Sequence, residues 1–152
     1  MTSFKLHKRS IARIAAVQSL YQIFLVQSPP HQAVTDFYSH FEKDFLESRN
    51  KVSYDKNFFT LLVEGVVDSL STIDPLIEKA LPENWAINRL DLVLLCVLRA
   101  ATFELWRMPE TDSAVIINEY LNVTHSFYDD KEPGFVNGIL HTLSVRLRTN
   151  QP

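Results

Sequence analysis

Two arginines and a tyrosine stand at helical intervals near the start of the chain, at Arg9, Arg13 and Tyr21. Side chains four residues apart share one face of a helix, so the two guanidinium groups are neighbours and the ring follows two further steps along. Basic groups beside an exposed ring suit single-stranded RNA, because the charges hold phosphates and the ring stacks a base. The alternative is a core role for Tyr21 and an ordinary surface role for the arginines, and spacing alone favours this alternative.

The charges are distributed unevenly along the chain. The net charge is −3, which by itself argues against a nucleic-acid partner. However, no acidic residue precedes Asp36 and none follows Glu132, so both ends are basic and the middle is acidic. The unopposed basic residues are Lys5, Lys8, Arg9 and Arg13 at the start and Arg146 and Arg148 at the end. Such asymmetry hints at a polyanionic partner, although on charge alone a solvated amino-terminal turn is the favoured explanation.

Motifs of catalysis and of cofactor binding are missing from the sequence. With only three glycines, it has no glycine-rich phosphate loop and no dinucleotide-binding fingerprint. No two of its five histidines stand three or four residues apart, so no helical metal pair exists. The sequence therefore predicts a protein that is not an enzyme and that holds neither a cofactor nor a metal ion.

The single cysteine, Cys96, excludes an internal disulfide and suits a reducing cytoplasm. It stands in the apolar run 94–98, which predicts a core position. No stretch approaches the roughly 18 apolar residues that a membrane span needs. We therefore expect a cytoplasmic protein without a membrane segment.

Helices must position these side chains, because scarce glycine disfavours tight hairpins and the prolines fall between apolar helical patterns. The predicted class is all-α, with about seven helices in two packed sub-bundles, 8–82 and 83–148, of one domain spanning 1–152. The predicted helices cover 8–27, 31–47, 55–70, a short stretch from 75 to 82, 86–106, 113–127 and 133–148.

Three residues carry more specific structural expectations. Asp74 is expected to cap the short fourth helix, with Pro75 in its first position. Arg99 stands in an apolar run and needs an acidic partner if it is buried, for which Glu104 and Glu119 are candidates. Gly138 stands inside the last helix, where close helix packing is the expected reason for a glycine.

Three segments of the chain resemble the NusB family. They are RIAAVQSLY at 13–21 after Arg9, LRAATFEL at 98–105, and the ordered series IINEY, SF and GFVNGIL at 116–120, 126–127 and 134–140. Together they span nearly the whole chain. NusB proteins bind the boxA element of leader RNA together with NusE, a small-subunit ribosomal protein, and help to load an antitermination complex on RNA polymerase. The resemblance implies the same function here.

Two other functions stay open. A helical module that binds only protein would suit the net acidity and the few arginines. An accessory to ribosomal RNA modification is the other, since NusB-like domains also form the front part of some ribosomal RNA cytosine methyltransferases. This chain has no room for a methyltransferase domain behind it, so we favour the free-standing factor.

The resemblance also implies where RNA is met. It favours the opening helix and the loop from Phe127 to Phe135, which would lie against that helix, although Phe135 serves equally well as a staple between two helices. The implied RNA-binding residues are Lys5, His7, Lys8, Arg9, Arg13, Tyr21, Phe127, Lys131 and Phe135.

The fifth predicted helix departs from part of the family. Many members carry an acid–base pair in a region that helps to dock NusE, and here those positions hold Leu94 and Leu95. Asp91, one turn earlier, could substitute for the lost acid. The extra apolar surface could instead favour a homodimer. We therefore take Asp91, Leu94 and Leu95 as the candidate partner-binding residues.

Overall fold

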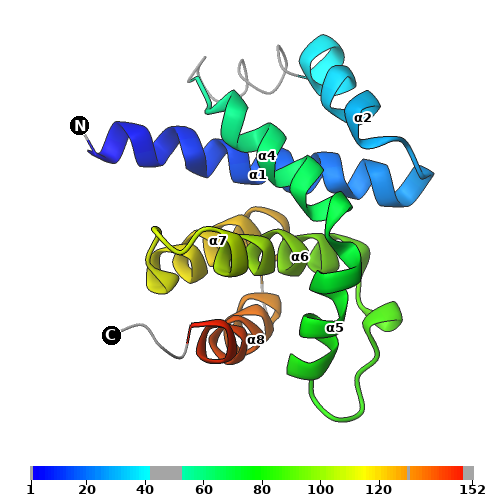
Figure 1. The fold of residues 1–152 in the computed structure, drawn as a ribbon, viewed down its shortest axis with the longest axis vertical. Coiled ribbons are helices and arrows are strands. Elements are labelled where there is room, and N and C mark those ends of the chain that lie inside the picture. The colour runs from blue at the N-terminus through cyan, green and yellow to red at the C-terminus, as the bar shows by residue number, and fades with distance from the viewer. Residues whose placement is uncertain (1, 42–52, 130, 149–152) are drawn as a thin grey trace. The chain divides into compact units, whose positions relative to one another are not determined.

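The computed structural model describes residues 2–41, 53–129 and 131–148, and every regular element in these ranges is helical (Figure 1). The all-α prediction is thereby confirmed. The α-helices are α1 (Thr2–Val26), α2 (Pro30–Asp36), α4 (Lys56–Asp68), α5 (Leu70–Ala80), α6 (Leu92–Arg107), α7 (Ser113–Phe127) and α8 (Glu132–Leu147), joined by a π-helical turn (Phe37–Phe41) and a 3₁₀ turn (Ile87–Arg89).

The chain divides into two compact units, Met1–Val67 and Asp68–Pro152. The division falls one helix earlier than the boundary expected near Pro82. The reason is that α5 packs against α6 and α8 and so belongs to the second unit. Proline marks where a helix ends, but it does not tell which neighbours that helix packs against.

Helix α1 ends in a tight cap just before the two prolines that were expected to stop it. Gln27 adopts a positive φ of 58°, and the Ser28 N–H donates to the Ile23 carbonyl at 3.2 Å. This six-to-one bond with a left-handed residue is the Schellman arrangement, in which glycine is the usual occupant. A left-handed glutamine is less favourable by about 1–2 kcal/mol, which the cap offsets.

The core of the first unit is built on an aromatic cluster formed by Phe37, Tyr54 and Phe59. The ring centroids of Phe37 and Phe59 lie 4.7 Å apart. The Tyr54 centroid lies 5.7 Å from that of Phe37 and 5.9 Å from that of Phe59. Phe37 opens the π-helical turn that follows α2, so the predicted helix over 31–47 changes its winding there. The rest of that predicted helix, and most of the polar stretch after it, lies outside the described residues.

Asp55 starts α4 and ties it to α1. Its carboxylate accepts the Phe58 N–H at 3.0 Å, a capping bond that satisfies one of the free donors of the first turn. Its own N–H donates to the Lys8 carbonyl at 3.3 Å. This pairing brings the start of α4 alongside the basic part of α1 within the first unit.

The prediction for Asp74 and Pro75 was wrong. Helix α5 begins at Leu70, so Pro75 lies inside the helix and Asp74 is not its cap. Asp74 instead forms two hydrogen bonds of 2.9 Å with the Arg99 guanidinium. Arg99 thus has an acidic partner, as its position required, and this partner comes from α5.

Helix α6 forms the centre of the second unit. Asp91 caps it, accepting the Leu94 N–H at 3.4 Å, so the helix starts six residues later than the predicted residue 86. Cys96 is fully buried, which confirms its predicted core position, and burial raises its pKa to about 12. A thiol held protonated in this way is a packing residue rather than a nucleophile.

The other end of α6 is capped by Arg148, which the sequence analysis had counted as part of a free basic terminus. Its guanidinium donates to the carbonyls of Leu105 and Met108 at 2.9 and 2.8 Å, and also to those of Glu104 and Thr111. The last carbonyls of a helix have no partner within it, so a buried cation satisfies them well. Arg148 is therefore used inside the second unit and is only 9% exposed.

Gly138 in α8 does not mark a close helix contact. A Cβ atom added there would meet no heavy atom within 4 Å, and the same holds at Gly134. The expectation of close packing was therefore wrong, and nothing within the described structure requires a glycine at either position.

Candidate nucleic-acid interface

The predicted RNA-binding residues are divided between the two units, and each group is described by itself. The first unit holds those of α1, and the second holds those of the segment between α7 and α8. The side chains of Lys5 and His7 lie outside the described residues. We define the α1 region as Lys8, Arg9 and Arg13 together with their neighbours Asp55 and Phe58. We define the loop region as Phe127, Lys131 and Phe135 together with their neighbours Trp85 and Tyr128.

Arg9 lies over an aromatic ring and beside a carboxylate. Its guanidinium carbon is 4.4 Å from the Phe58 ring centroid, and its Nε is 3.7 Å from the Asp55 carboxylate. The Nε makes no hydrogen bond to any described residue, although the side chain keeps 29% of its surface exposed. The Nε itself is buried, so Arg9 is held in place by a ring and a charge while only the exposed part of its side chain stays open to a ligand.

Arg13 shares that ring but not that exposure. Its guanidinium carbon lies 5.0 Å from the Phe58 centroid, which agrees with the predicted common face of the two arginines. However, Arg13 is only 1% exposed. In this conformation it has almost no surface for a phosphate, and its position is that of a packing residue.

Lys8 and Tyr21 both keep an intermediate exposure. Tyr21 therefore fits neither extreme of the sequence analysis, being neither a fully buried core ring nor a fully exposed one.

In the loop region, hydrogen bonding fixes the chain directly after α7. The Tyr128 hydroxyl donates to the Asp91 carboxylate at the start of α6. Burial, followed by this hydrogen bond, raises the Tyr128 pKa above its usual value. Phe127 is half-buried, whereas Lys131 is exposed.

Phe135 packs against a residue that the sequence analysis did not single out. Its ring centroid lies 5.2 Å from that of Trp85, with the ring planes inclined at 39°. Phe135 is half-buried and Trp85 is 52% exposed. The only signal for Trp85 in the sequence is a large aromatic residue in a short polar stretch after Pro82.

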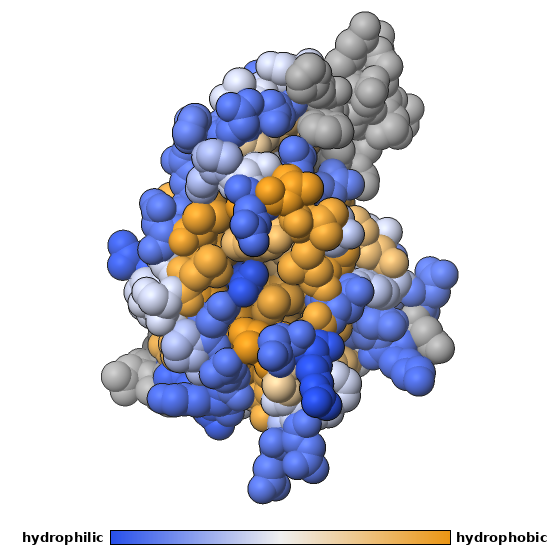
Figure 2. Space-filling view, turned by 90° about the vertical axis from the view of Figure 1, so that its right-hand side faces the viewer, coloured by the Kyte–Doolittle hydropathy of each residue, from blue (hydrophilic) through white to orange (hydrophobic). Residues whose placement is uncertain are grey.

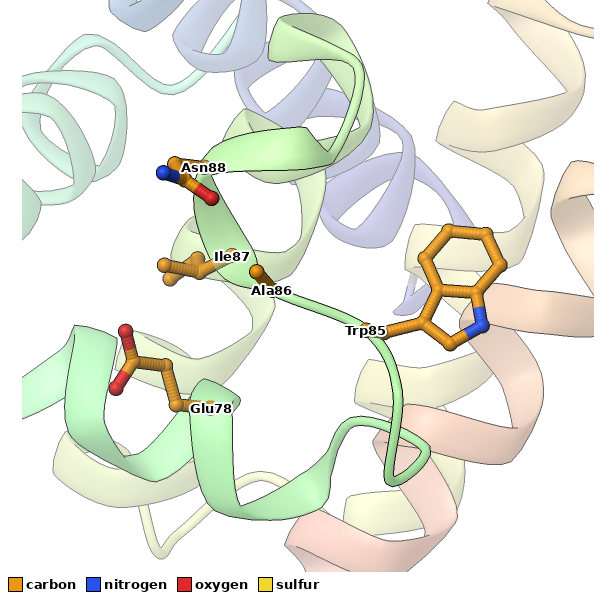
Figure 3. Close-up of a pocket in the computed structure, with 5 residues that line it drawn as sticks. All are labelled: Glu78, Trp85, Ala86, Ile87 and Asn88. Atoms are coloured by element: carbon orange, nitrogen blue, oxygen red, sulfur yellow. The ribbon is translucent and has the colours of Figure 1, made fainter.

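Trp85 also borders a cavity of about 550 Å³, whose other lining residues are Glu78, Ala86, Ile87 and Asn88 (Figure 3). Glu78 is the one titratable side chain in this lining, so the cavity offers no acid–base pair. Within residues 2–41, 53–129 and 131–148, no three His, Cys, Asp or Glu residues are grouped so that they could hold a metal ion. Over the same residues, no helix has the length and apolar content to cross a membrane.

The candidate partner-binding residues differ sharply in exposure. Leu94 and Leu95 are each only 7% exposed, so they act in the core and have little surface to offer another protein. Asp91 is exposed, but it caps α6 and accepts the Tyr128 hydroxyl.

Exposed apolar surface occurs elsewhere. Apolar side chains reach the surface among hydrophilic ones (Figure 2). At the end of α1, Leu25 and Val26 are 57% and 61% exposed, and in α4 Leu61 is 47% exposed. Gathered apolar surface is a usual sign of contact with another protein.

The fold and these groups together define a small all-helical protein whose candidate site offers cations and aromatic rings. The model of the NusB family matches residues 10–144, and the chain belongs to this family. The transcription antitermination protein NusB of Rhizobium rhizogenes is 36% identical over 142 residues, which cover 93% of this chain and 89% of that protein. The resemblance that the sequence motifs indicated is therefore confirmed.

Solved structures agree with this assignment. The NusB structure of T. maritima matches 90% of this chain and 89% of its own, with a TM-score of 0.72 and 29% identity. A chain in the crystal structure of antitermination factors NusB and NusE in complex with double-stranded RNA covers 96% of this chain and 99% of its own. Its TM-score is 0.73 and its identity is 24%, a likeness that concerns the fold.

Proposed function

We propose that this chain is a transcription antitermination factor that binds boxA-type RNA together with NusE and helps to assemble the antitermination complex on RNA polymerase. The observation that carries this function is family membership across residues 10–144, together with relatives that are transcription antitermination proteins. The factor acts by binding, in the cytoplasm, and catalyses no reaction.

In the α1 region, Arg9 is the principal phosphate ligand. The Phe58 ring and the Asp55 carboxylate already restrict its side chain, so less conformational entropy is lost when RNA binds. Its Nε is buried beside the Asp55 carboxylate, so an anionic oxygen is met by the exposed part of the side chain, which keeps 29% of its surface in solvent. Lys8, one residue before, adds a second cation, and Lys5 and His7 extend the same end of α1.

Arg13 supports the position of Arg9 indirectly. It is buried against the same Phe58 ring, so it holds the ring on which Arg9 lies. Its contribution to RNA binding is therefore through Arg9 rather than through a phosphate of its own.

In the loop region, Lys131 supplies a cation, and Phe127 and Phe135 supply rings. Lys131 is exposed, and its carbonyl accepts the Phe135 N–H at 3.2 Å, so the two side chains stand one helical turn apart. NusE binds elsewhere on the protein, and exposed apolar side chains such as Leu25 and Val26 suit such a contact better than the buried Leu94 and Leu95.

The test is a titration of fluorescent boxA-type RNA into the protein, with and without NusE, at several salt concentrations. Arg9→Ala and Lys131→Ala should each weaken binding and reduce the slope of log affinity against log salt by about one unit, because one phosphate contact is lost. Arg107→Ala is the matched control, since it removes one exposed arginine outside both regions. A protein–NusE complex with no affinity for the RNA would contradict the proposed function.

A module that binds only protein is the second candidate. It is favoured by the net charge of −3 and by the internal use of Arg13 and Arg148, which leaves fewer cations for a polyanion. The same titration separates the two functions, because a protein-only module would bind NusE and leave the RNA free.

A further inference from the structure

Trp85 is an unusually exposed aromatic residue for a segment that is otherwise well fixed. Its backbone N–H donates to the Pro82 carbonyl at 2.9 Å, which closes a turn directly after α5. Its side chain nevertheless keeps 52% of its surface in solvent. Tryptophan gains more than most residues from burial, so a fixed but half-exposed indole is a costly arrangement for the free protein.

The Trp85 indole packs against a second aromatic ring. Figure 3 shows it pointing away from Glu78, Ile87 and Asn88, the side chains on the other side of the cavity. It meets Phe135 of α8, with the centroids 5.2 Å apart and the planes inclined at 39°. Because Phe135 covers one part of the indole and half of the residue is exposed, a broad part of the ring system is open to a further flat group.

A cation lies close to this ring pair, but acidic residues do too. Lys131 is exposed one helical turn before Phe135. Glu83 and Glu132 are neighbours in sequence of Trp85 and Lys131, and they disfavour a ligand that is recognised only by its negative charge. The ligand that fits both facts presents a flat, uncharged face to the rings and a single phosphate to Lys131.

We propose that Trp85 and Phe135 form a stacking platform for one base of the single-stranded RNA, an inference that rests on the proposed function. The base stacks on the open face of the indole, and its phosphate meets the Lys131 ammonium group. Trp85 is thus an RNA-binding residue in the segment before the 3₁₀ turn. Stacking releases no counterions, so its share of the affinity should persist at salt concentrations that weaken the contacts of Arg9 and Lys131.

The chain itself provides a direct probe, because its two tryptophans are Trp85 and Trp106. When only this chain is labelled with 5-fluorotryptophan, NusE contributes no signal, and Trp85→Phe and Trp106→Phe assign the two fluorine resonances. Adding boxA-type RNA to the complex with NusE should shift the Trp85 resonance and leave that of Trp106 in place. A Trp85 resonance that moves on addition of NusE and not of RNA would overturn the platform and assign Trp85 to the protein contact.

Affinity provides the second readout. Trp85→Ala should weaken RNA binding about tenfold, the scale of one lost base stack, whereas Trp85→Tyr should stay within about threefold of the original protein because it keeps a ring. The loss with Trp85→Ala should be equal at low and high salt. If both variants bind as tightly as the original protein while Arg9→Ala binds weakly, the platform is wrong and the proposed function stands. If the original protein binds no RNA, both fail.

Discussion

The α1 region and the loop region contain the same kinds of residue but use them in opposite ways. In the α1 region the Phe58 ring is covered by Arg9 and Arg13, so ring and cations engage each other. In the loop region the rings of Trp85 and Phe135 engage each other, and Lys131 is exposed. Arg9 is fixed on its ring and partly exposed, which suits a phosphate, whereas Trp85 keeps half of its surface open, which suits a base. The α1 region should therefore contribute charge and the loop region stacking.

The largest effect should come from Arg13, which is either a packing residue or a direct RNA ligand. Arg13 is only 1% exposed and packs near Phe58. Arg13→Ala therefore leaves a cavity and removes the contacts that the buried side chain makes. We expect the free energy of unfolding to fall by about 2–4 kcal/mol, measured by urea denaturation.

Arg9→Ala is the matched control for that experiment. It removes the neighbouring guanidinium, which is partly exposed, so it should cost little stability and more RNA affinity. Unchanged stability with a large loss of RNA affinity in Arg13→Ala would contradict the packing role and restore Arg13 as a direct RNA ligand.

The next effect concerns the carboxyl-terminal basic residues. Arg148→Met removes the guanidinium that binds four carbonyls at the end of α6 and should lower the free energy of unfolding by about 2 kcal/mol. Arg146→Met is the control, since Arg146 is exposed and donates to the Lys79 carbonyl. Thermal and urea unfolding of both variants measure the difference. Equal stabilities would mean that the Arg148 cap contributes nothing.

The regular helices were predictable because they depend on local pattern. Helix α7 has the predicted bounds, because the apolar stripe that predicts it lies within its own segment. The start of α6 was less predictable, because a 3₁₀ turn lies directly before the Asp91 cap and its residues continue the helical pattern of the sequence. Local chemistry thus fixes that a helix exists better than it fixes where the helix begins.

The uses of individual charges were not predictable, because they depend on residues far apart in the sequence. Asp74 pairs with Arg99 across two helices, and Arg148 reaches carbonyls about 40 residues earlier. Helical spacing placed Arg9 and Arg13 on one face, but it could not show that one is half-buried and the other nearly fully buried. For the candidate site, residue types and faces could therefore be predicted, but exposure could not.

Tyr128 gives a smaller effect, confined to the loop region. Tyr128→Phe removes the hydroxyl that donates to Asp91 and keeps the ring, so it should cost about 1 kcal/mol of stability. RNA affinity should fall about threefold if this bond positions Lys131 and Phe135, while the affinity for NusE stays unchanged; fluorescence titration measures both.

The same bond predicts a dependence on pH. The Tyr128 pKa is raised in the folded protein from its ordinary value of 10.0, so the bond's contribution to stability is complete below about pH 10 and is lost as the pH rises beyond that. The difference in stability between the original protein and Tyr128→Phe should therefore shrink above pH 10. A difference that stays constant through that range would show that the hydroxyl does not hold the loop region.

The smallest effect, and the one of opposite sign, belongs to Gly138. An added Cβ there meets nothing within 4 Å, so Gly138→Ala should raise the free energy of unfolding by up to about 1 kcal/mol through helix propensity alone. Thermal unfolding measures this gain, and a loss of stability would show that the space around α8 is tighter than the structure describes. The same variant also tests the loop region, three residues after Phe135. If it is more stable but binds RNA or NusE more weakly, the glycine is kept for the close approach of a partner, whereas unchanged binding would leave the loop region's contacts to its side chains.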